Sequence, residues 1–244
     1  MHKAFHYKSI TSTNDVAKQY ILGGETMPFF VIADSQTNGR GRRGNDWNSS
    51  NNGNLYTSYV RSINHAKISN IALLPQCVAI KICEAISQNL NIIANVKWPN
   101  DIFINDKKVG GILLETIINH DENITCIIGV GMNIYHAPDL KNSKYDAICL
   151  SDIAQQQLND DIKNIISHAI VSGCDMFECS NVMDIVQQWH YFDMFHDQVI
   201  EVTNNNTTIF GNNLGINDTG ALQLMMSDGD IVCVNEADAR IKIL

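Results

Sequence analysis

Apolar residues in the N-terminal quarter of the chain follow two spacings, that of a helix and that of buried strands. The polar run Ser12–Asp15 precedes apolar residues at helical spacing, and Gly23-Gly24 follows them, so a helix is predicted between these ends. The short apolar runs Phe29–Ala33 and Leu55–Val60 predict strands. Between them, Gln36–Asn54 is rich in Gly, Asn, Arg and Ser and almost free of apolar residues, which predicts a long loop.

The middle of the chain predicts a long helix, then a set of strands and two further helices. Ile68–Leu90 carries apolar residues at helical spacing, and Pro75 predicts that its first turns form a separate piece. Short apolar runs joined by tight turns predict successive strands at Val96–Trp98, Ile102–Ile104, Gly111–Ile118 and Thr125–Gly129. Asn105-Asp106-Lys107 has the composition of a hairpin turn. Asp160–Phe177 and Val182–Trp189 predict helices that pack on this sheet.

The pattern changes after about Phe195, where short β-rich runs alternate with Asn, Gly and Asp turns. These runs are Val199–Thr203, Thr207–Phe210, Ala221–Met225 and Asp230–Val234. Such a pattern is typical of a small barrel, here of about 50 residues. We therefore predict a domain boundary near residue 194, which separates a domain of residues 1–194 from one of residues 195–244.

The bulk composition is that of a globular protein and argues against several functional classes. Of the 244 residues, 45% are hydrophobic and 18% are charged, which suits an ordinary core and argues against disorder. The net charge of -9 argues against a surface that attracts nucleic acid throughout. Seven scattered cysteines without C-x-x-C spacing indicate reduced thiols in a cytoplasmic protein. The polar N-terminus does not resemble a signal peptide, and no apolar run is long enough to predict a membrane span.

The most unusual segment is Gly39–Trp47, which begins with the letters GRGRRG. Arg40, Arg42 and Arg43 are separated and flanked by glycines in an otherwise acidic protein. Glycine lets the backbone approach a ligand, and arginine offers bidentate donors to phosphate or carboxylate, so the segment predicts a loop that wraps an anion. On composition alone, a solvated basic loop or an RGG-like RNA-binding patch explains it as well. The phosphate-binding P-loop pattern is absent.

Three further segments place polar side chains or glycines at strand ends. Val96–Asp101 (VKWPND) ends a predicted strand where α/β folds commonly build sites, although a plain turn also explains it. Lys107–Glu115 (KKVGGILLE) passes through two glycines into a strand, on which a ligand would lie flat beside a lysine; a solvated hairpin tip is the alternative. Gly129–Ile134 (GVGMNI) has two glycines, which also leave a strand without side chains at those positions; a tight turn accounts for them equally well.

The order and spacing of the four segments say more than any one of them. GRGRRG, KWPND, KVGGILLE and GVGMNI resemble, in that order, the motif set of bacterial biotin–protein ligases. Further matches to that family are Ser12-Thr13-Asn14, Gln36, Trp189, Phe192 and Gly220-Ala221-Leu222. The resemblance covers nearly the whole chain, and its most specific part is the pair GRGRRG and KWPND.

The resemblance implies an α+β fold, in which a mixed sheet flanked by helices, like that of class II synthetases, precedes a small SH3-like barrel. It implies a ligase that uses ATP to convert biotin into biotinyl-5'-AMP, with Mg²⁺ neutralising the phosphates. The enzyme would then pass biotin to a lysine of the biotin carboxyl carrier protein of acetyl-CoA carboxylase. The residues that the resemblance assigns to biotin are Ser12, Thr13, Gln36, Gly39, Arg40, Lys108, Gly110 and Gly111. Those that it assigns to ATP and the adenylate are Arg40, Arg42, Trp47, Lys97, Asn100, Asp101, Gly131 and Asn133.

Two cations have the catalytic role in this assignment. Lys108 matches the family's invariant lysine, and Lys107 is its solvated neighbour. With Arg42, Lys108 would stabilise the charge that builds on phosphate oxygens. Asp101 is the candidate magnesium ligand, and Asn45 stands where some relatives carry another basic residue.

Two other functions are weighed against this one. A lipoate–protein ligase shares the fold and the adenylate chemistry, but it lacks the paired GRGRRG and KWPND segments. A nucleic-acid binder is disfavoured by the net charge and by the lack of aromatic residues between the arginines.

No DNA partner is expected, because only eleven residues precede Ser12, too few for a helix-turn-helix. Residues 195–244 carry only Arg240 and Lys242 as cations against several acids, so they would repel a duplex. The sequence therefore resembles the short, non-repressor class of biotin ligases. No membrane partner is expected, and monomer and homodimer are both left open.

Overall fold

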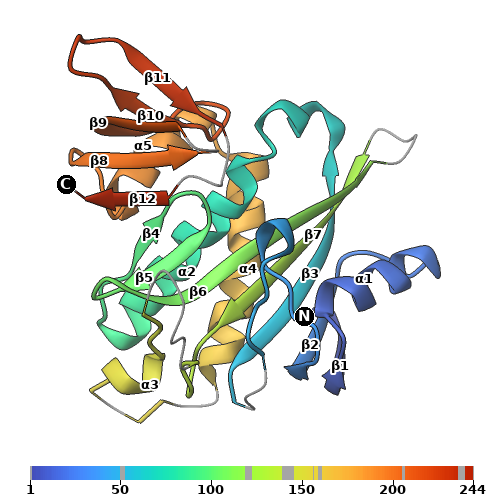
Figure 1. Ribbon diagram of the computed structural model, residues 1–244. Coiled ribbons are helices and arrows are strands. Elements are labelled where there is room, and N and C mark those ends of the chain that lie inside the picture. Colours follow the sequence, from blue (N-terminus) through green and yellow to red (C-terminus); the bar gives the residue numbers. More distant parts are fainter. Residues whose placement is uncertain are drawn as a thin grey trace.

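The computed structural model describes residues 2–49, 53–118, 123–138, 146–155, 157–158, 161–204, 207–235 and 240–243. Its centre is a seven-stranded sheet in the order β1-β2-β3-β7-β6-β5-β4 (Figure 1). β1 and β2 run parallel and the other neighbours antiparallel, which confirms the predicted mixed sheet. The strands are β1 (Lys3–Ile10), β2 (Phe29–Gln36), β3 (Leu55–Asn64), β4 (Asn95–Lys97), β5 (Asp101–Ile104), β6 (Lys107–Ile118) and β7 (Asn123–Met132).

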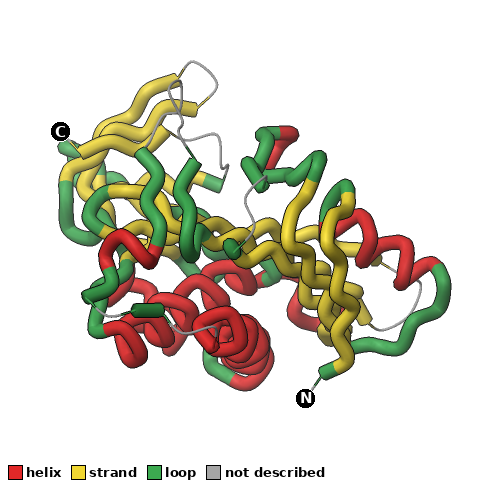
Figure 2. Tube along the Cα trace, turned by 90° about the horizontal axis from the view of Figure 1, so that it is seen from below, coloured by secondary structure: helices red, strands yellow, loops and turns green. Residues whose placement is uncertain are grey.

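Helices cover both faces of this sheet. Neighbouring residues of a strand point to opposite faces, so Ser58 and Arg61 of β3 lie on different sides. Ser58 contacts Thr13 of α1, whereas Arg61 pairs with Asp175 of α4. α1 therefore lies on one face, and α4, with the α2 helix packed on it, lies on the other, where Figure 2 shows the longer helices grouped together. The helices are α1 (Thr13–Leu22), α2 (Leu73–Leu90), α3 (Leu150–Ile153), α4 (Asp161–Cys179) and α5 (Val182–Phe192).

The predicted helix starts and turns are confirmed. α1 begins directly after the N-cap residue Ser12 and ends before Gly23. The predicted break near Pro75 is present, because a 3-10 helix, η2 (His65–Asn70), precedes α2. Pro75 lies in the first turn of α2, where its missing N–H removes no helical hydrogen bond. Asn105 and Asp106 both have positive φ, at 50° and 60°, as a type I′ hairpin between β5 and β6 requires.

A second sheet is built from the C-terminal residues. Its five antiparallel strands have the order β11-β10-β9-β8-β12, and they are separate from the first sheet. Among the described strands, β11 and β12 lie at the two edges of this sheet, so its closure into a barrel stays a prediction. The domain boundary near residue 194 also stays a prediction. The strands are β8 (Val199–Asn204), β9 (Thr207–Ile216), β10 (Leu222–Met225), β11 (Ile231–Val234) and β12 (Arg240–Ile243).

The two sheets are joined by a continuous apolar core and by buried hydrogen bonds. Gly220, in the turn before β10, accepts hydrogen bonds through its carbonyl oxygen from Gln76 of α2 (2.9 Å) and from Trp98 (3.0 Å). Asp193, after α5, accepts from Trp189 (3.1 Å) and from Asn213 of β9 (2.9 Å). Burial raises the pKa of Asp193, and these hydrogen bonds act in the opposite direction. The C-terminal sheet is thus anchored to α2, to Trp98 after β4 and to the end of α5.

Some elements differ from those that the apolar pattern predicts. β1, β12 and the short α3 were not predicted, because their residues are partly polar or too few to show a period. β6 begins at Lys107 rather than at Gly111, and β9 continues to Ile216. Residue 160 of a predicted helix, residues 50–52 of the predicted loop, and residues 205–206, 236–239 and 244 of the predicted C-terminal domain lie outside the described residues.

Two expectations drawn from composition are tested by the structure. All seven cysteines are free thiols, as their spacing predicted, and five of them are buried. Burial raises the pKa of Cys77 to about 12, so this thiol stays protonated and inert. In the part of the chain that the structure describes, no helix is long and apolar enough to cross a membrane.

Candidate active site

Three glycines of the central strands form a flat strip on the face of the sheet that carries α1. Gly111 of β6 and Gly131 of β7 are direct partners in the sheet. A Cβ atom on Gly131 would overlap the ring of Trp47, and one on Gly111 would lie 3.2 Å from the same ring. A Cβ on Gly129 would likewise overlap the amide of Asn14. Trp47 and Asn14 therefore pack directly on the strand backbone, which is possible only because side chains are missing at all three positions.

Gly110 does not belong to this strip. Because neighbouring residues of a strand alternate between faces, Gly110 points away from Gly111. A Cβ atom at Gly110 would overlap the sulfur of the buried residue Met132. Gly110 therefore faces the core and Gly111 faces the strip, and support of a ligand by these glycines stays a prediction.

The segment Gly39–Trp47 folds into a compact hairpin over the strip. Backbone hydrogen bonds run from Trp47 N to Gly39 O (2.9 Å) and from Gly41 N to Asn45 O (2.7 Å). Arg43, at the tip, has a positive φ of 54°. The hairpin lays the Trp47 ring on Gly111 and Gly131, and the indole N–H is buried without a hydrogen-bond partner among the described residues. Trp47 therefore covers the surface on which the sequence predicted a flat ligand.

Small polar side chains gather at one end of the strip, around the start of α1. Ser12, Thr13 and Asn14 are all buried there. Gln36 Oε1 accepts a hydrogen bond from Thr13 N (2.7 Å), and Gln36 Nε2 donates to Ser49 Oγ (2.8 Å). The predicted residues Ser12, Thr13 and Gln36 are thus brought together. These groups offer both donors and acceptors, which suits a neutral polar head group.

Two residues of this end were missed by the sequence reasoning. Ser58 of β3 is buried, and its hydroxyl lies 2.7 Å from Thr13 Oγ1 and contacts the amide oxygen of Asn14. Asn14 donates to Glu115 Oε2 (2.7 Å). A signal was present in the sequence, because Ser58 and Glu115 each interrupt an apolar strand.

Arg40 lies in a charged cluster beside the same end. Its Nη2 atom lies 2.6 Å from Asp15 Oδ1 and 3.1 Å from Glu115 Oε2. Lys18 Nζ lies 2.7 Å from Glu115 Oε1. Burial raises the pKa of Glu115, but the hydrogen bonds from Lys18 and Asn14 outweigh it, so the net pKa is lowered. The carboxylate is therefore ionised at neutral pH.

A second group of charges lies beside Trp47, around the hairpin of β5 and β6. Lys108 Nζ lies 2.7 Å from Asp101 Oδ1 and 5.2 Å from the centre of the Trp47 ring. Arg42 Nη1 lies 3.4 Å from the side-chain oxygen of the buried residue Asn100. Burial lowers the pKa of Arg42. The structure thus brings four residues predicted for the adenylate, Arg42, Trp47, Asn100 and Asp101, close to Lys108, which was predicted for biotin and for catalysis.

Other predicted residues have different surroundings. Lys97 is buried and donates to the carbonyl oxygen of Ile241 in β12 (3.1 Å), and burial lowers its pKa to about 8. The amide of Asn133 donates to Ile148 O (3.3 Å). Lys107 is exposed on the hairpin, as expected for a solvated neighbour of Lys108. Lys97 therefore links the two sheets, a contact that the motif alone did not predict.

A metal ion would find few protein ligands here. Among the residues that the structure describes, no three His, Cys, Asp or Glu side chains lie close enough together to hold one. Asp101 is paired with Lys108. Because Mg²⁺ bound with a nucleotide relies on phosphate oxygens and one or two carboxylates, Asp101 fits the role of a single protein ligand.

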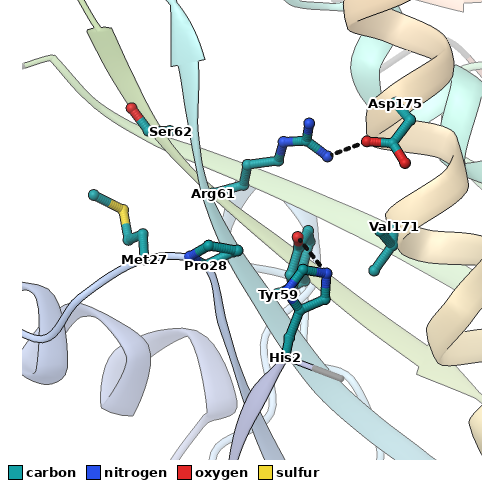
Figure 3. Close-up of a pocket in the computed structure, with 8 residues that line it drawn as sticks. All are labelled: His2, Met27, Pro28, Tyr59, Arg61, Ser62, Val171 and Asp175. Atoms are coloured by element: carbon teal, nitrogen blue, oxygen red, sulfur yellow. Dashed lines mark hydrogen bonds and ion pairs between the residues drawn. The ribbon is translucent and has the colours of Figure 1, made fainter.

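A separate pocket of about 320 Å³ lies on the other face of the sheet (Figure 3). Arg61 of β3 points across it to Asp175 of α4, with 2.6 Å between Nη1 and Oδ1. The residues that line it are His2, Met27, Pro28, Tyr59, Arg61, Ser62, Val171 and Asp175. None of them is a predicted site residue, so this pocket is distinct from the glycine strip.

The comparison with protein families decides the family. The model of the biotin/lipoate A/B protein ligase family matches residues 7–133, which is more than half of the chain. The chain belongs to the biotin/lipoate A/B protein ligase family. The matched segment of this family member contains the glycine strip, the hairpin and both groups of polar side chains.

Relatives and solved structures agree with this membership. The chain is 28% identical over 235 residues to the bifunctional ligase/repressor BirA of Bacillus subtilis, and the match covers 93% of this chain and 70% of that protein. It is 33% identical over 114 residues to the biotin–[acetyl-CoA-carboxylase] ligase of Paracoccus denitrificans, covering 45% of this chain and 46% of that protein. The biotin protein ligase from Aquifex aeolicus in complex with biotin and ATP superposes with a TM-score of 0.83, 22% identity and full coverage of both chains. This likeness establishes the fold.

Proposed function

We propose that this family member is a biotin–protein ligase, which activates biotin with ATP and transfers it to a lysine of a carrier protein. The observation that best supports this proposal is the strip formed by Gly111, Gly129 and Gly131. Hydroxyl and amide groups lie at one end of it, and Lys108 and Arg42 lie at the other. The family also includes lipoate ligases, which act on a different acid. Biotin is preferred because the relatives of Bacillus subtilis and Paracoccus denitrificans carry names of biotin ligases or of BirA.

The first step proposed is the formation of biotinyl-5'-AMP. An oxygen of the biotin carboxylate attacks the α-phosphorus of ATP, the bond to the β-phosphate oxygen breaks, and pyrophosphate leaves. Negative charge is distributed over phosphate oxygens, so fixed cations stabilise the transition state. We propose Lys108 and Arg42 for this role, because Lys108 lies beside Trp47 and Arg42 beside Asn100. Mg²⁺ bound with ATP, with Asp101 as its proposed protein ligand, would neutralise further phosphate charge.

The second step proposed is acyl transfer. The ε-amine of the acceptor lysine attacks the acyl carbon of the adenylate, the bond to the phosphate oxygen breaks, AMP leaves, and the new amide nitrogen loses a proton. We propose the biotin carboxyl carrier protein of acetyl-CoA carboxylase as acceptor, supported by the name of the Paracoccus denitrificans relative. Water would hydrolyse the adenylate, so the hairpin with Trp47 is the proposed cover.

The test is an ATP–pyrophosphate exchange assay with either biotin or lipoate as the acid. We expect exchange that depends on biotin and does not occur with lipoate. Exchange that occurs with lipoate and not with biotin would identify the chain as a lipoate ligase instead. If neither acid supports exchange, and filter binding detects saturable RNA binding, the nucleic-acid alternative replaces the ligase.

The hairpin is expected to be more resistant to protease when ligand is bound than in the free protein. Arg42 and Arg43 lie at its tip, and the hairpin buries little apolar surface apart from Trp47. Trypsin should therefore cut the free protein in the GRGRRG segment, after Arg40, Arg42 or Arg43. Adding biotin and ATP should slow these cuts at least several-fold, measured by mass spectrometry of the fragments. Equal cleavage rates with and without the two ligands would contradict a covering role.

A further inference from the structure

Glu115 joins three elements of the α1 face through its two carboxylate oxygens. It lies on β6 four residues beyond Gly111, and because strand residues alternate, both side chains are on the same face. Oε2 accepts from Asn14 at the start of α1 (2.7 Å) and from Arg40 of the hairpin (3.1 Å). Oε1 accepts from Lys18, one turn further along α1 (2.7 Å). One side chain thus fixes the helix and the hairpin to the sheet.

The charges of this cluster balance. Arg40 and Lys18 face the carboxylates of Asp15 and Glu115, so the cluster has two cations and two anions. The guanidinium of Arg40 is therefore compensated by the protein itself. Arg42, two residues away, faces the neutral amide of Asn100 instead. The two arginines of the hairpin consequently have different surroundings, and Arg42 is better placed to meet the anionic part of a ligand.

We propose that Glu115 is a positioning residue, whose carboxylate clamps Arg40 of the hairpin and Asn14 of α1 onto β6. This inference rests on the proposed function, because the clamped groups border the end of the strip assigned to biotin. Asn14 in turn contacts Ser58, whose hydroxyl lies 2.7 Å from Thr13 Oγ1. The carboxylate therefore orients the hydroxyl and amide groups of that end, and it holds the hairpin that carries Trp47 over the strip.

The clamp requires an ionised acceptor. Three residues donate hydrogen bonds to the two oxygens of Glu115, and glutamine would present its own N–H donors to at least one of these residues. Hydrogen bonds to a charged group are among the stronger ones, and losing one misplaces the groups that it orients. We expect Glu115→Gln to raise the KM for biotin by about tenfold or more, with a smaller change in kcat, because the residue does not touch the reacting phosphate.

The experiment compares the wild type with three variants in biotin-dependent exchange and in limited trypsin cleavage. Glu115→Gln should raise the KM for biotin and speed cleavage after Arg43. Asp15→Asn weakens the hold on Arg40 from the other side, at a position exposed enough to tolerate it, and should speed cleavage with a smaller rise in KM. The matched control is Glu25→Gln, which also removes a carboxylate paired with lysine, 2.8 Å from Lys3 Nζ, and should leave both readouts unchanged.

The outcomes separate this inference from the function on which it rests. Wild-type protein that shows no biotin-dependent exchange refutes the ligase, yet cleavage of ligand-free Glu115→Gln still tests the clamp. Wild-type KM and wild-type cleavage in both Glu115→Gln and Asp15→Asn would overturn the proposal. If Glu115→Gln does not fold, Asp15→Asn alone decides, and unchanged cleavage in that variant counts against the clamp.

Discussion

Replacing Lys108 by alanine is expected to lower kcat for adenylate formation by about 10²–10³-fold, the usual cost of removing one fixed group that stabilises transition-state charge. Lys108 Nζ is held by Asp101 at 2.7 Å and lies above the Trp47 ring, so its charge stays beside the strip. Lys107 points into solvent from the same hairpin. Lys107→Ala is therefore the matched control, one residue away and of the same chemistry, and we expect it to change kcat less than about twofold.

The measurement is single-turnover formation of biotinyl-5'-AMP under saturating biotin and ATP, so that binding and chemistry are separated. Thermal unfolding of both variants checks the fold. Similar small effects of the two alanine substitutions would refute the catalytic assignment of Lys108. A loss confined to KM would instead make Lys108 a binding residue that contributes equally to ground state and transition state.

Gly131→Val is expected to lower the rate of biotin-dependent exchange by at least about 10²-fold, because a misplacement of about 1 Å in a site has that cost. A Cβ at this position would overlap the Trp47 ring, so the ring must move off the strip, and a side chain would also occupy the surface proposed for the ligand. Gly23→Ala is the control, because Gly23 has an ordinary helical φ of -76° and its added Cβ meets nothing closer than 3.4 Å. We expect the control to retain wild-type exchange.

A double variant separates two causes of this loss. Gly131→Ala with Trp47→Ala removes the ring that the new methyl group would meet. The reference is Trp47→Ala alone. If the ligand itself requires the bare strip, the double variant is less active than Trp47→Ala. Equal exchange in these two variants would show that the glycine serves only to seat Trp47. Equal activity of wild type and Gly131→Val would contradict the strip as the ligand surface.

Several features of this protein follow from the sequence alone. The helix at Thr13–Leu22, the break before α2 and the turn at Asn105-Asp106 were predictable, because caps, proline and positive-φ residues act within a few positions of the chain. The motifs also determined the family, which the match over residues 7–133 bears out. β1 was missed, because Lys3–Ile10 is an edge strand whose exposed positions carry polar residues.

Only the tertiary structure decided which side each residue faces and which distant residues meet. The pattern of a strand says that Gly110 and Gly111 point to opposite faces, but not which face carries α1, since that depends on how the helices pack. The pairing of Glu115 with Asn14 joins residues 101 positions apart, and local periodicity contains no information on such a contact. For the same reason Lys97, adjacent to the predicted site in the sequence, is held by Ile241 of the C-terminal sheet, whereas Lys108 lies beside Trp47 on the strip.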